Sequence, residues 1–113
     1  MVRQRICEAL VEQHRFAEIK LGLQRRQWPE WLMLLDLYFA GQREMEVSFK
    51  ELASVSGLSE TTTFRRTTQL IDAQVLERIR DEHDRRRSFV CLAPNTRAKM
   101  DEIMDCLGQV LFA

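Results

Sequence analysis

Apolar residues recur at helical spacing over most of the chain. A partial stripe runs through residues 3–27, a segment rich in helix-forming residues: Ile6, Leu10, Ala17 and Leu21. A second helix is expected from Pro29 to Gly41, because proline suits a first helical turn and glycine suits a helix end. This helix is apolar on nearly every side, so we expect it to be the central core helix. A last helix begins at Pro94, with apolar residues again three and four positions apart: Met100, Ile103, Met104, Leu107 and Leu111.

Two short helices joined by a tight turn are expected in the middle of the chain. Ser48 and Glu51 have the spacing of a capping box at the start of the first helix. The stretch "SGL" at 56–58 supplies the turn, and Ser59 suits the cap of a second helix over residues 60–73. Two short helices around a glycine-containing turn are typical of a helix-turn-helix.

After Gln74 the spacing of apolar residues changes from the helical repeat to a two-residue alternation. Residues 75–81 and 87–93 are expected to form two strands, with Val90 and Leu92 on one face of the second. A two-stranded ribbon after a helix-turn-helix is a wing. The predicted fold is therefore mainly α with a small β-hairpin wing, a winged helix-turn-helix. We expect one domain over 1–113, divided into an N-terminal helix, the helix-turn-helix plus wing, and a C-terminal helix: 1–27, 48–92 and 94–113.

Charge is distributed unevenly along the chain, although the 17 basic and 17 acidic residues cancel. Residues 1–27 and 59–99 each carry a net charge of +3, whereas 28–58 and 100–113 each carry −3. The basic segment 59–99 includes the wing tip "DEHDRRR", where Asp84 is expected to fix the geometry by pairing with a neighbouring arginine. A charged tip of this kind is either a solvated turn or a surface built to contact an anion.

The second helix of the pair has one face suited to DNA. On a helical wheel Phe64, Thr67, Leu70 and Ile71 gather on the side expected to be buried. The opposite side carries the guanidinium, amide and hydroxyl groups that bind base edges and phosphates: Thr62, Arg65 and Gln69, flanked by Thr61 and Arg66. Any exposed helix face is polar, but here the preceding helix and turn favour DNA recognition. An arginine at the wing tip would enter the minor groove.

Several functions receive no support from the sequence. No apolar run is long enough to span a bilayer, and no signal peptide is expected, since charged residues interrupt the first positions. The cysteines, Cys7, Cys91 and Cys106, are odd in number and widely spaced, which favours reduced thiols and a cytoplasmic location. His14 and His83 are isolated, so no metal site is expected. No catalytic motif is present, and we predict neither an enzyme nor a cofactor.

Residues 49–94 resemble the winged helix-turn-helix core of MarR-type bacterial transcriptional regulators. The most specific features are Leu52-Ala53…Gly57-Leu58-Ser59 and the wing pattern Asp84-x-Arg86-Arg87…Val90-x-Leu92. The resemblance implies a homodimer, built by the N- and C-terminal helices, that binds a pseudo-palindromic site in double-stranded DNA. The resemblance and the helical-wheel pattern of residues 60–73 together give a set of candidate DNA-binding residues: Ser59, Thr61, Thr62, Arg65, Arg66, Gln69, Arg85, Arg86 and Arg87.

The chain departs from the family pattern at a few positions. Gln74 stands where a glycine usually follows the recognition helix, and Ala93 replaces the usual threonine cap before Pro94. Thr63 and Arg66 occupy positions that are usually apolar.

Two further interpretations stay open. The resemblance suggests a small-molecule effector pocket, which would be lined by Phe16, Trp28, Trp31 and Tyr38, although aromatics at helical spacing are more often core residues. Cys7 could be a redox-sensing thiol or an inert buried one. The alternative function is a winged-helix protein-interaction module without specific DNA binding, using the last helix as its partner surface.

Overall fold

The computed structural model describes residues 1–84 and 86–112. The elements follow one another as α1 (Val2–Leu21), a 3₁₀ helix η1 (Arg25–Gln27), α2 (Trp28–Gln42), β1 (Val47–Ser48), α3 (Phe49–Ser56), α4 (Glu60–Asp72), β2 (Leu76–Arg80), β3 (Ser88–Leu92) and α5 (Pro94–Phe112). The fold is mostly helical with a small antiparallel sheet, which confirms the predicted winged helix-turn-helix.

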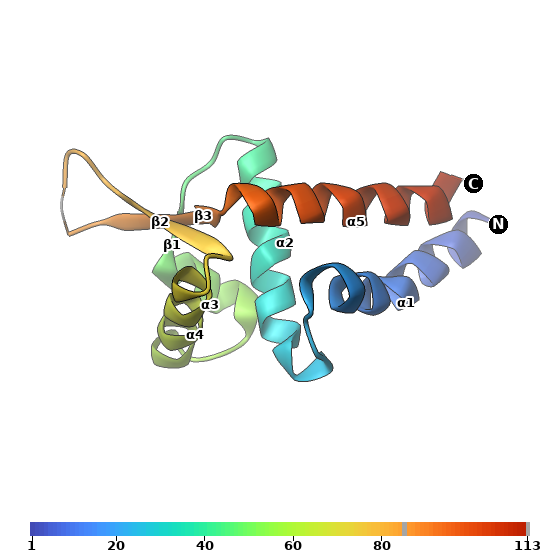
Figure 1. Cartoon of the computed structure of the whole chain (residues 1–113), viewed down its shortest axis with the longest axis horizontal. Coiled ribbons are helices and arrows are strands. Elements are labelled where there is room, and N and C mark those ends of the chain that lie inside the picture. Colours follow the sequence, from blue (N-terminus) through green and yellow to red (C-terminus); the bar gives the residue numbers. More distant parts are fainter. Residues whose placement is uncertain (85, 113) are drawn as a thin grey trace.

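The molecule is elongated, with extents of 50 × 27 × 23 Å. Figure 1 shows the β2–β3 hairpin at one end and both chain termini at the other. Helices α1 and α5 run together toward the end that holds the termini, and α2 crosses the middle (Figure 1). Helix α4 lies on the hairpin's side of α2, away from the termini (Figure 1). The two elements predicted to bind DNA are therefore close to each other and distant from the terminal helices.

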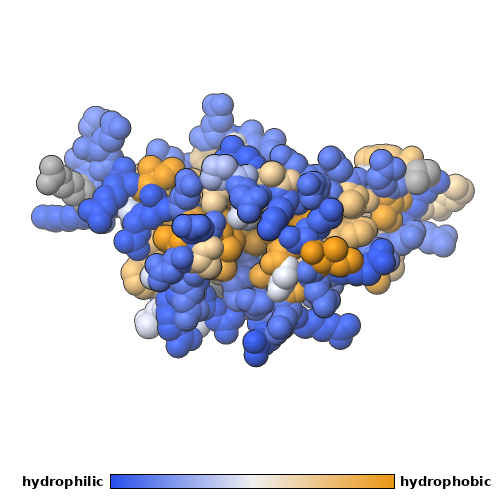
Figure 2. All heavy atoms as spheres, viewed as in Figure 1, coloured by the Kyte–Doolittle hydropathy of each residue, from blue (hydrophilic) through white to orange (hydrophobic). Residues whose placement is uncertain are grey.

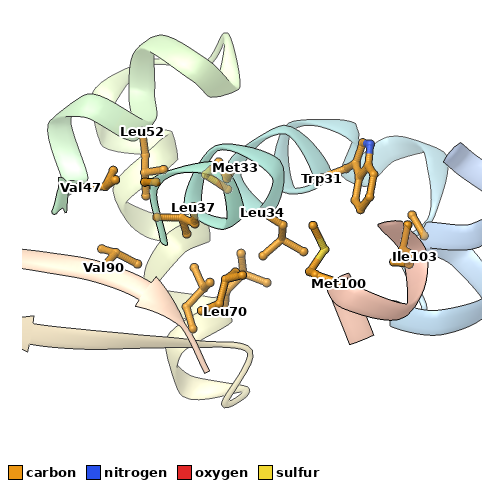
Figure 3. Packing of buried hydrophobic residues seen from close by; sticks show 14 residues of the cluster. Trp31, Met33, Leu34, Leu37, Val47, Leu52, Leu70, Val90, Met100 and Ile103 are labelled. Carbon is orange, nitrogen blue, oxygen red and sulfur yellow. The ribbon is translucent and has the colours of Figure 1, made fainter. Parts of the chain in front are cut away.

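Helix α2 forms the centre of the core, as its all-round apolar pattern predicts. Its Trp31, Met33, Leu34 and Leu37 are buried, and residues from α3, α4, the sheet and α5 pack around them (Figure 3). Burial of each large apolar side chain contributes about 1.5–3 kcal/mol. The core therefore fixes the position of every element that borders α2.

The sheet has three strands in the order β1-β3-β2, all antiparallel. Leu76 pairs with Leu92 and Arg78 with Val90, so β2 and β3 form the expected hairpin. Val90 and Leu92 are both buried, as the alternation predicts. Strand β1 was not predicted, because two residues are too short to show a period; its Val47 pairs with Val90.

The first helix is shorter than predicted. It ends at Leu21, where Gly22 adopts a left-handed conformation (φ 70°). The Gly22 N–H donates to the Glu18 carbonyl (2.9 Å), and the Leu23 N–H donates to the Ala17 carbonyl (3.4 Å). Glycine adopts this conformation without the steric penalty that other residues pay. The expected stripe on this helix is wrong in part, because Ala9 and Ala17 are buried while Ile6 and Leu10 are exposed.

Candidate nucleic-acid interface

Side-chain caps and a hydrogen-bonded turn fix the helix-turn-helix. The Ser48 hydroxyl accepts from the Glu51 backbone N–H (3.2 Å), and Ser59 does the same for Thr62 (3.2 Å), so both predicted caps are confirmed. Between the helices, Gly57 adopts a left-handed conformation (φ 75°). The Leu58 backbone N–H donates to the Ser56 hydroxyl at 3.1 Å. These local contacts set the angle at which α4 leaves α3.

The buried face of α4 differs from the predicted one by a rotation about the helix axis. Thr63, Thr67 and Leu70 are buried, whereas Phe64 is 51% exposed. The Thr63 hydroxyl is 2.9 Å from that of Ser56, which satisfies both groups inside the protein. The expectation that Phe64 faces the core is therefore wrong, because a hydrogen-bonded threonine takes that place.

Most of the predicted recognition residues lie on the solvent side of α4. Thr61, Arg65 and Gln69 are exposed. Thr62 is half-buried, and its hydroxyl accepts a hydrogen bond from that of the exposed Ser59 (3.0 Å), so these two hydroxyls also complete the helix cap. The outward face thus presents a guanidinium, an amide and hydroxyl groups.

Arg66 does not project freely beside this face. Its guanidinium donates to the carboxylate of Glu30 at 2.9 Å. The side chain of Glu30 is 8% exposed and that of Arg66 31%, so the ion pair is largely withdrawn from water. The pair joins α4 to the first turn of α2. Sequence reasoning missed this pair, because its two residues are 36 positions apart in the chain.

On its other flank α4 meets the base of the wing. The rings of Phe49 and Phe64 are 5.2 Å apart, and the guanidinium of Arg78 on β2 lies 4.8 Å from the centre of the Phe49 ring. Arginine above an aromatic face is an attractive arrangement. These contacts tie the wing to the start of α3 and to α4.

The wing tip is held in shape by backbone hydrogen bonds. The Asp81 N–H donates to the Arg87 carbonyl (3.1 Å), and the Arg87 N–H donates to the Asp84 carbonyl (3.0 Å). The Asp84 carboxylate accepts from the backbone N–H of Arg86 at 3.0 Å. Asp84 thus has the predicted internal role, but through a backbone amide rather than an arginine side chain. Arg86 and Arg87 are exposed, and Arg85 lies outside the described residues.

The junction between α4 and the wing contains a strained residue. Gln74 has φ 63°, a left-handed conformation, at the position where the family pattern has glycine. The Val75 N–H donates to the Leu70 carbonyl (2.9 Å), and the Ala93 N–H donates to the Val75 carbonyl (3.1 Å). Gln74 therefore adopts a left-handed conformation that glycine would adopt without a steric penalty, at a conformational cost.

The aromatic residues considered for an effector pocket have separate surroundings. Trp31 is a core residue whose indole N–H donates to the Gln13 side chain (2.9 Å). Trp28 stacks on His14 with ring centroids 4.3 Å apart. The Tyr38 hydroxyl donates to the Asp101 carboxylate (2.6 Å), and this hydrogen bond, with burial, raises the pKa of Tyr38 to about 12. Phe16 packs against the edge of the core.

The cysteines have contrasting environments. Cys7 is exposed, so of its two interpretations the inert buried thiol is wrong. Cys91 is half-buried in β3, and burial raises the pKa of its thiol, which disfavours the reactive thiolate. Within residues 1–84 and 86–112, no group of three or more His, Cys, Asp or Glu side chains is placed to hold a metal ion. Over the same residues, no helix is both long and apolar enough to cross a membrane.

Comparison with known proteins places this geometry in a family. A sequence model of the MarR family matches residues 27–88. The fold is similar to that of a transcriptional regulator from Thermotoga maritima (TM-score 0.70, 17% identity), with 95% of this chain and 70% of that chain covered. It is also similar to AbsC, a MarR family transcriptional regulator from Streptomyces coelicolor (TM-score 0.64, 17% identity, 96% and 69% covered). A MarR family transcriptional regulator from Silicibacter pomeroyi gives a TM-score of 0.65 at 24% identity, with 94% and 66% covered.

A search of curated proteins gave no match. The chain spans 66 to 70% of the length of the three structural relatives. The fold defines the class, a winged helix-turn-helix protein. The match over residues 27–88 covers more than half of the chain, and the protein belongs to the MarR family.

Proposed function

We propose that this MarR-family regulator recognises a specific DNA sequence, with α4 in the major groove and the wing at the adjacent minor groove. The observation that carries the proposal is the exposed face of α4, where Arg65 and Gln69 point away from the core beside Thr61. Arginine pairs with the edge of guanine and glutamine with that of adenine through two hydrogen bonds each. Arg65 and Gln69 are therefore assigned to base reading.

The other candidate residues take supporting roles in this proposal. Ser59 and Thr62 cap α4 and present its N-terminal end to a phosphate. Arg86 and Arg87 supply positive charge at the wing tip, where the hydrogen-bonded turn limits their freedom. Arg66 positions α4 through Glu30; direct contact of Arg66 or Arg85 with DNA stays a prediction. No catalytic residue or cofactor is part of the proposal.

The proposed assembly is a homodimer through α1 and α5. Apolar residues show on the surface of the arm that these two helices form (Figure 2). Leu10 is 59% exposed and Phe112 84% exposed. Such residues gain by burial against a second copy. A twofold dimer would bind two half-sites separated by about one turn of DNA, roughly 34–36 Å.

A small-molecule effector is a further proposal that the relatives suggest. One relative, NadR, was solved in complex with 4-hydroxyphenylacetate (TM-score 0.68, 18% identity). In this chain an apolar groove of about 450 Å³ runs between α1 and α5, bordered by Ile6, Leu10 and Leu107 among others. The groove lies at the proposed dimer surface, so a ligand there would act on the assembly.

Selection of genomic fragments by the purified protein tests the proposal. We expect enrichment of fragments that share an inverted repeat, because a twofold dimer reads two copies of one half-site. Arg65→Ala should weaken binding to the selected site by about 1–3 kcal/mol and relax its sequence preference. Replacing Arg86 and Arg87 by glutamine should weaken binding to all sequences alike and flatten its salt dependence. Equal, weak retention of every fragment would instead favour the protein-interaction module.

A further inference from the structure

A recess lies along the flank of α4 that faces away from Phe64. Segments far apart in the sequence line it: Arg26 and Gln27 from η1, Glu30 from α2, and Arg65, Arg66 and Gln69 from α4. Its volume is about 310 Å³. The recess therefore shares Arg65 and Gln69 with the face proposed to read DNA, and it extends that face toward η1.

The recess carries an excess of positive charge. Of its three arginines, Arg66 is paired with the carboxylate of Glu30. Among the residues that the structure describes, neither Arg26 nor Arg65 forms an ion pair. Two guanidinium groups, which donate hydrogen bonds and accept none, thus border one depression. A negatively charged ligand is the chemical complement of such a site.

The backbone that carries Arg26 is fixed before any ligand binds. The Gln27 side-chain oxygen accepts from the Gln24 backbone N–H at 3.0 Å, and the Gln27 backbone N–H donates to the Gln24 backbone carbonyl at 2.9 Å. Immediately after this turn, Trp28 stacks on His14 of α1. A side chain mounted on a fixed turn loses less conformational freedom on binding than one on a mobile loop.

We propose that this recess binds a backbone phosphate of duplex DNA, next to the bases that α4 reads. Arg26 is the phosphate contact and the amide of Gln27 is an additional donor. Arg65, which is assigned to a base, adds positive charge from the other wall. The Glu30–Arg66 ion pair joins α4 to the start of α2, which directly follows η1. It thereby holds η1 beside α4, where both can border the phosphate. This inference rests on the proposed function, because it places the duplex along α4.

The proposal predicts an effect on affinity without an effect on sequence preference. Contacts to phosphate position a protein on DNA but carry no sequence information. Each phosphate neutralised contributes about 0.9 to the slope of log affinity against log salt. Loss of the Arg26 contact should therefore reduce that slope by about 0.9, which is about a 3.5-fold smaller loss of affinity over a fourfold rise in salt.

Arg26→Gln is the test variant and Arg25→Gln its matched control. Both residues lie in η1, both are exposed and each substitution removes one positive charge, but Arg25 does not line the recess. Binding of a duplex from the selected fragments, and of a shuffled duplex of equal composition, is measured over a range of salt concentrations. Arg26→Gln should lower affinity several-fold for both duplexes and reduce the slope, and Arg25→Gln should change both quantities much less.

Three outcomes would overturn the proposal. Equal effects of the two substitutions would mean that only diffuse charge matters at η1. A loss confined to the selected duplex would make Arg26 a base-reading residue. Tight binding of inorganic phosphate in the absence of DNA, lost in Arg26→Gln, would make the recess a site for a free anion. A fourth outcome concerns the proposed function: if the unsubstituted protein binds both duplexes equally, sequence-specific recognition fails. This result is distinguishable from the three outcomes above.

Discussion

The ion pair between Glu30 and Arg66 gives the sharpest prediction about stability. Arg66→Met removes the guanidinium but keeps most of the side chain's apolar bulk, and it leaves the Glu30 carboxylate without its partner. The Glu30 side chain is 8% exposed, so water can solvate its charge only poorly. Breaking a fully buried pair costs about 3–5 kcal/mol. Because the Arg66 side chain is 31% exposed, water can enter as the arginine leaves, and we expect a smaller loss of about 2 kcal/mol.

The matched variants are Glu30→Gln and the double variant with both substitutions. Glu30→Gln should cost about 1 kcal/mol, since Arg66 can turn its charge toward water. In the double variant no charge stays buried, so its loss should be at least 1 kcal/mol smaller than the sum of the two single losses. Urea unfolding of all four proteins at neutral pH and one fixed protein concentration measures these differences, because the stability of the proposed dimer would depend on concentration. Single losses that simply add would refute a direct interaction between the two side chains.

Two further predictions concern single residues. Gln74→Gly should raise the free energy of unfolding by about 0.5–1 kcal/mol, because Gln74 has φ 63° and glycine has no steric penalty there. The control Ala73→Gly, at φ −81°, should lower the free energy of unfolding. A lower free energy of unfolding in both variants would contradict the argument. The single tyrosine, Tyr38, should ionise at about pH 12 in a rapid pH jump followed by phenolate absorbance, and in Asp101→Ala at a clearly lower pH. Because folding raises this pKa, the contribution of Tyr38 to stability is complete below about pH 10 and is lost as the pH rises toward 12. If the native protein showed an unshifted midpoint of Tyr38 ionisation, the result would contradict the Tyr38–Asp101 hydrogen bond.

The features that could be predicted from the sequence are those with local causes. The helix caps at Ser48 and Ser59 depend on residues within one turn, and the structure confirms both. The β2–β3 hairpin follows from alternation within two adjacent segments. Strand β1 and the Arg66–Glu30 pair depend on residues 43 and 36 positions away in the chain, and no local pattern encodes them. The rotation of α4 belongs to this second group.

The orientation of α4 is set by polar contacts as much as by apolar packing. Thr63 contacts the Ser56 hydroxyl, Thr67 donates to the sulfur of Met33 at 3.7 Å, and Arg66 pairs with Glu30. Apolar contacts are non-directional, so an interface built from them alone would tolerate a small rotation of the helix. Hydrogen bonds weaken steeply with angle, so the 2.9 Å contacts of Thr63 and Arg66 favour one rotation of the helix. That rotation turns Phe64 outward and directs Arg65 away from the core, so Thr63 and Arg66, which depart from the family pattern, help to determine which side chains of α4 face solvent.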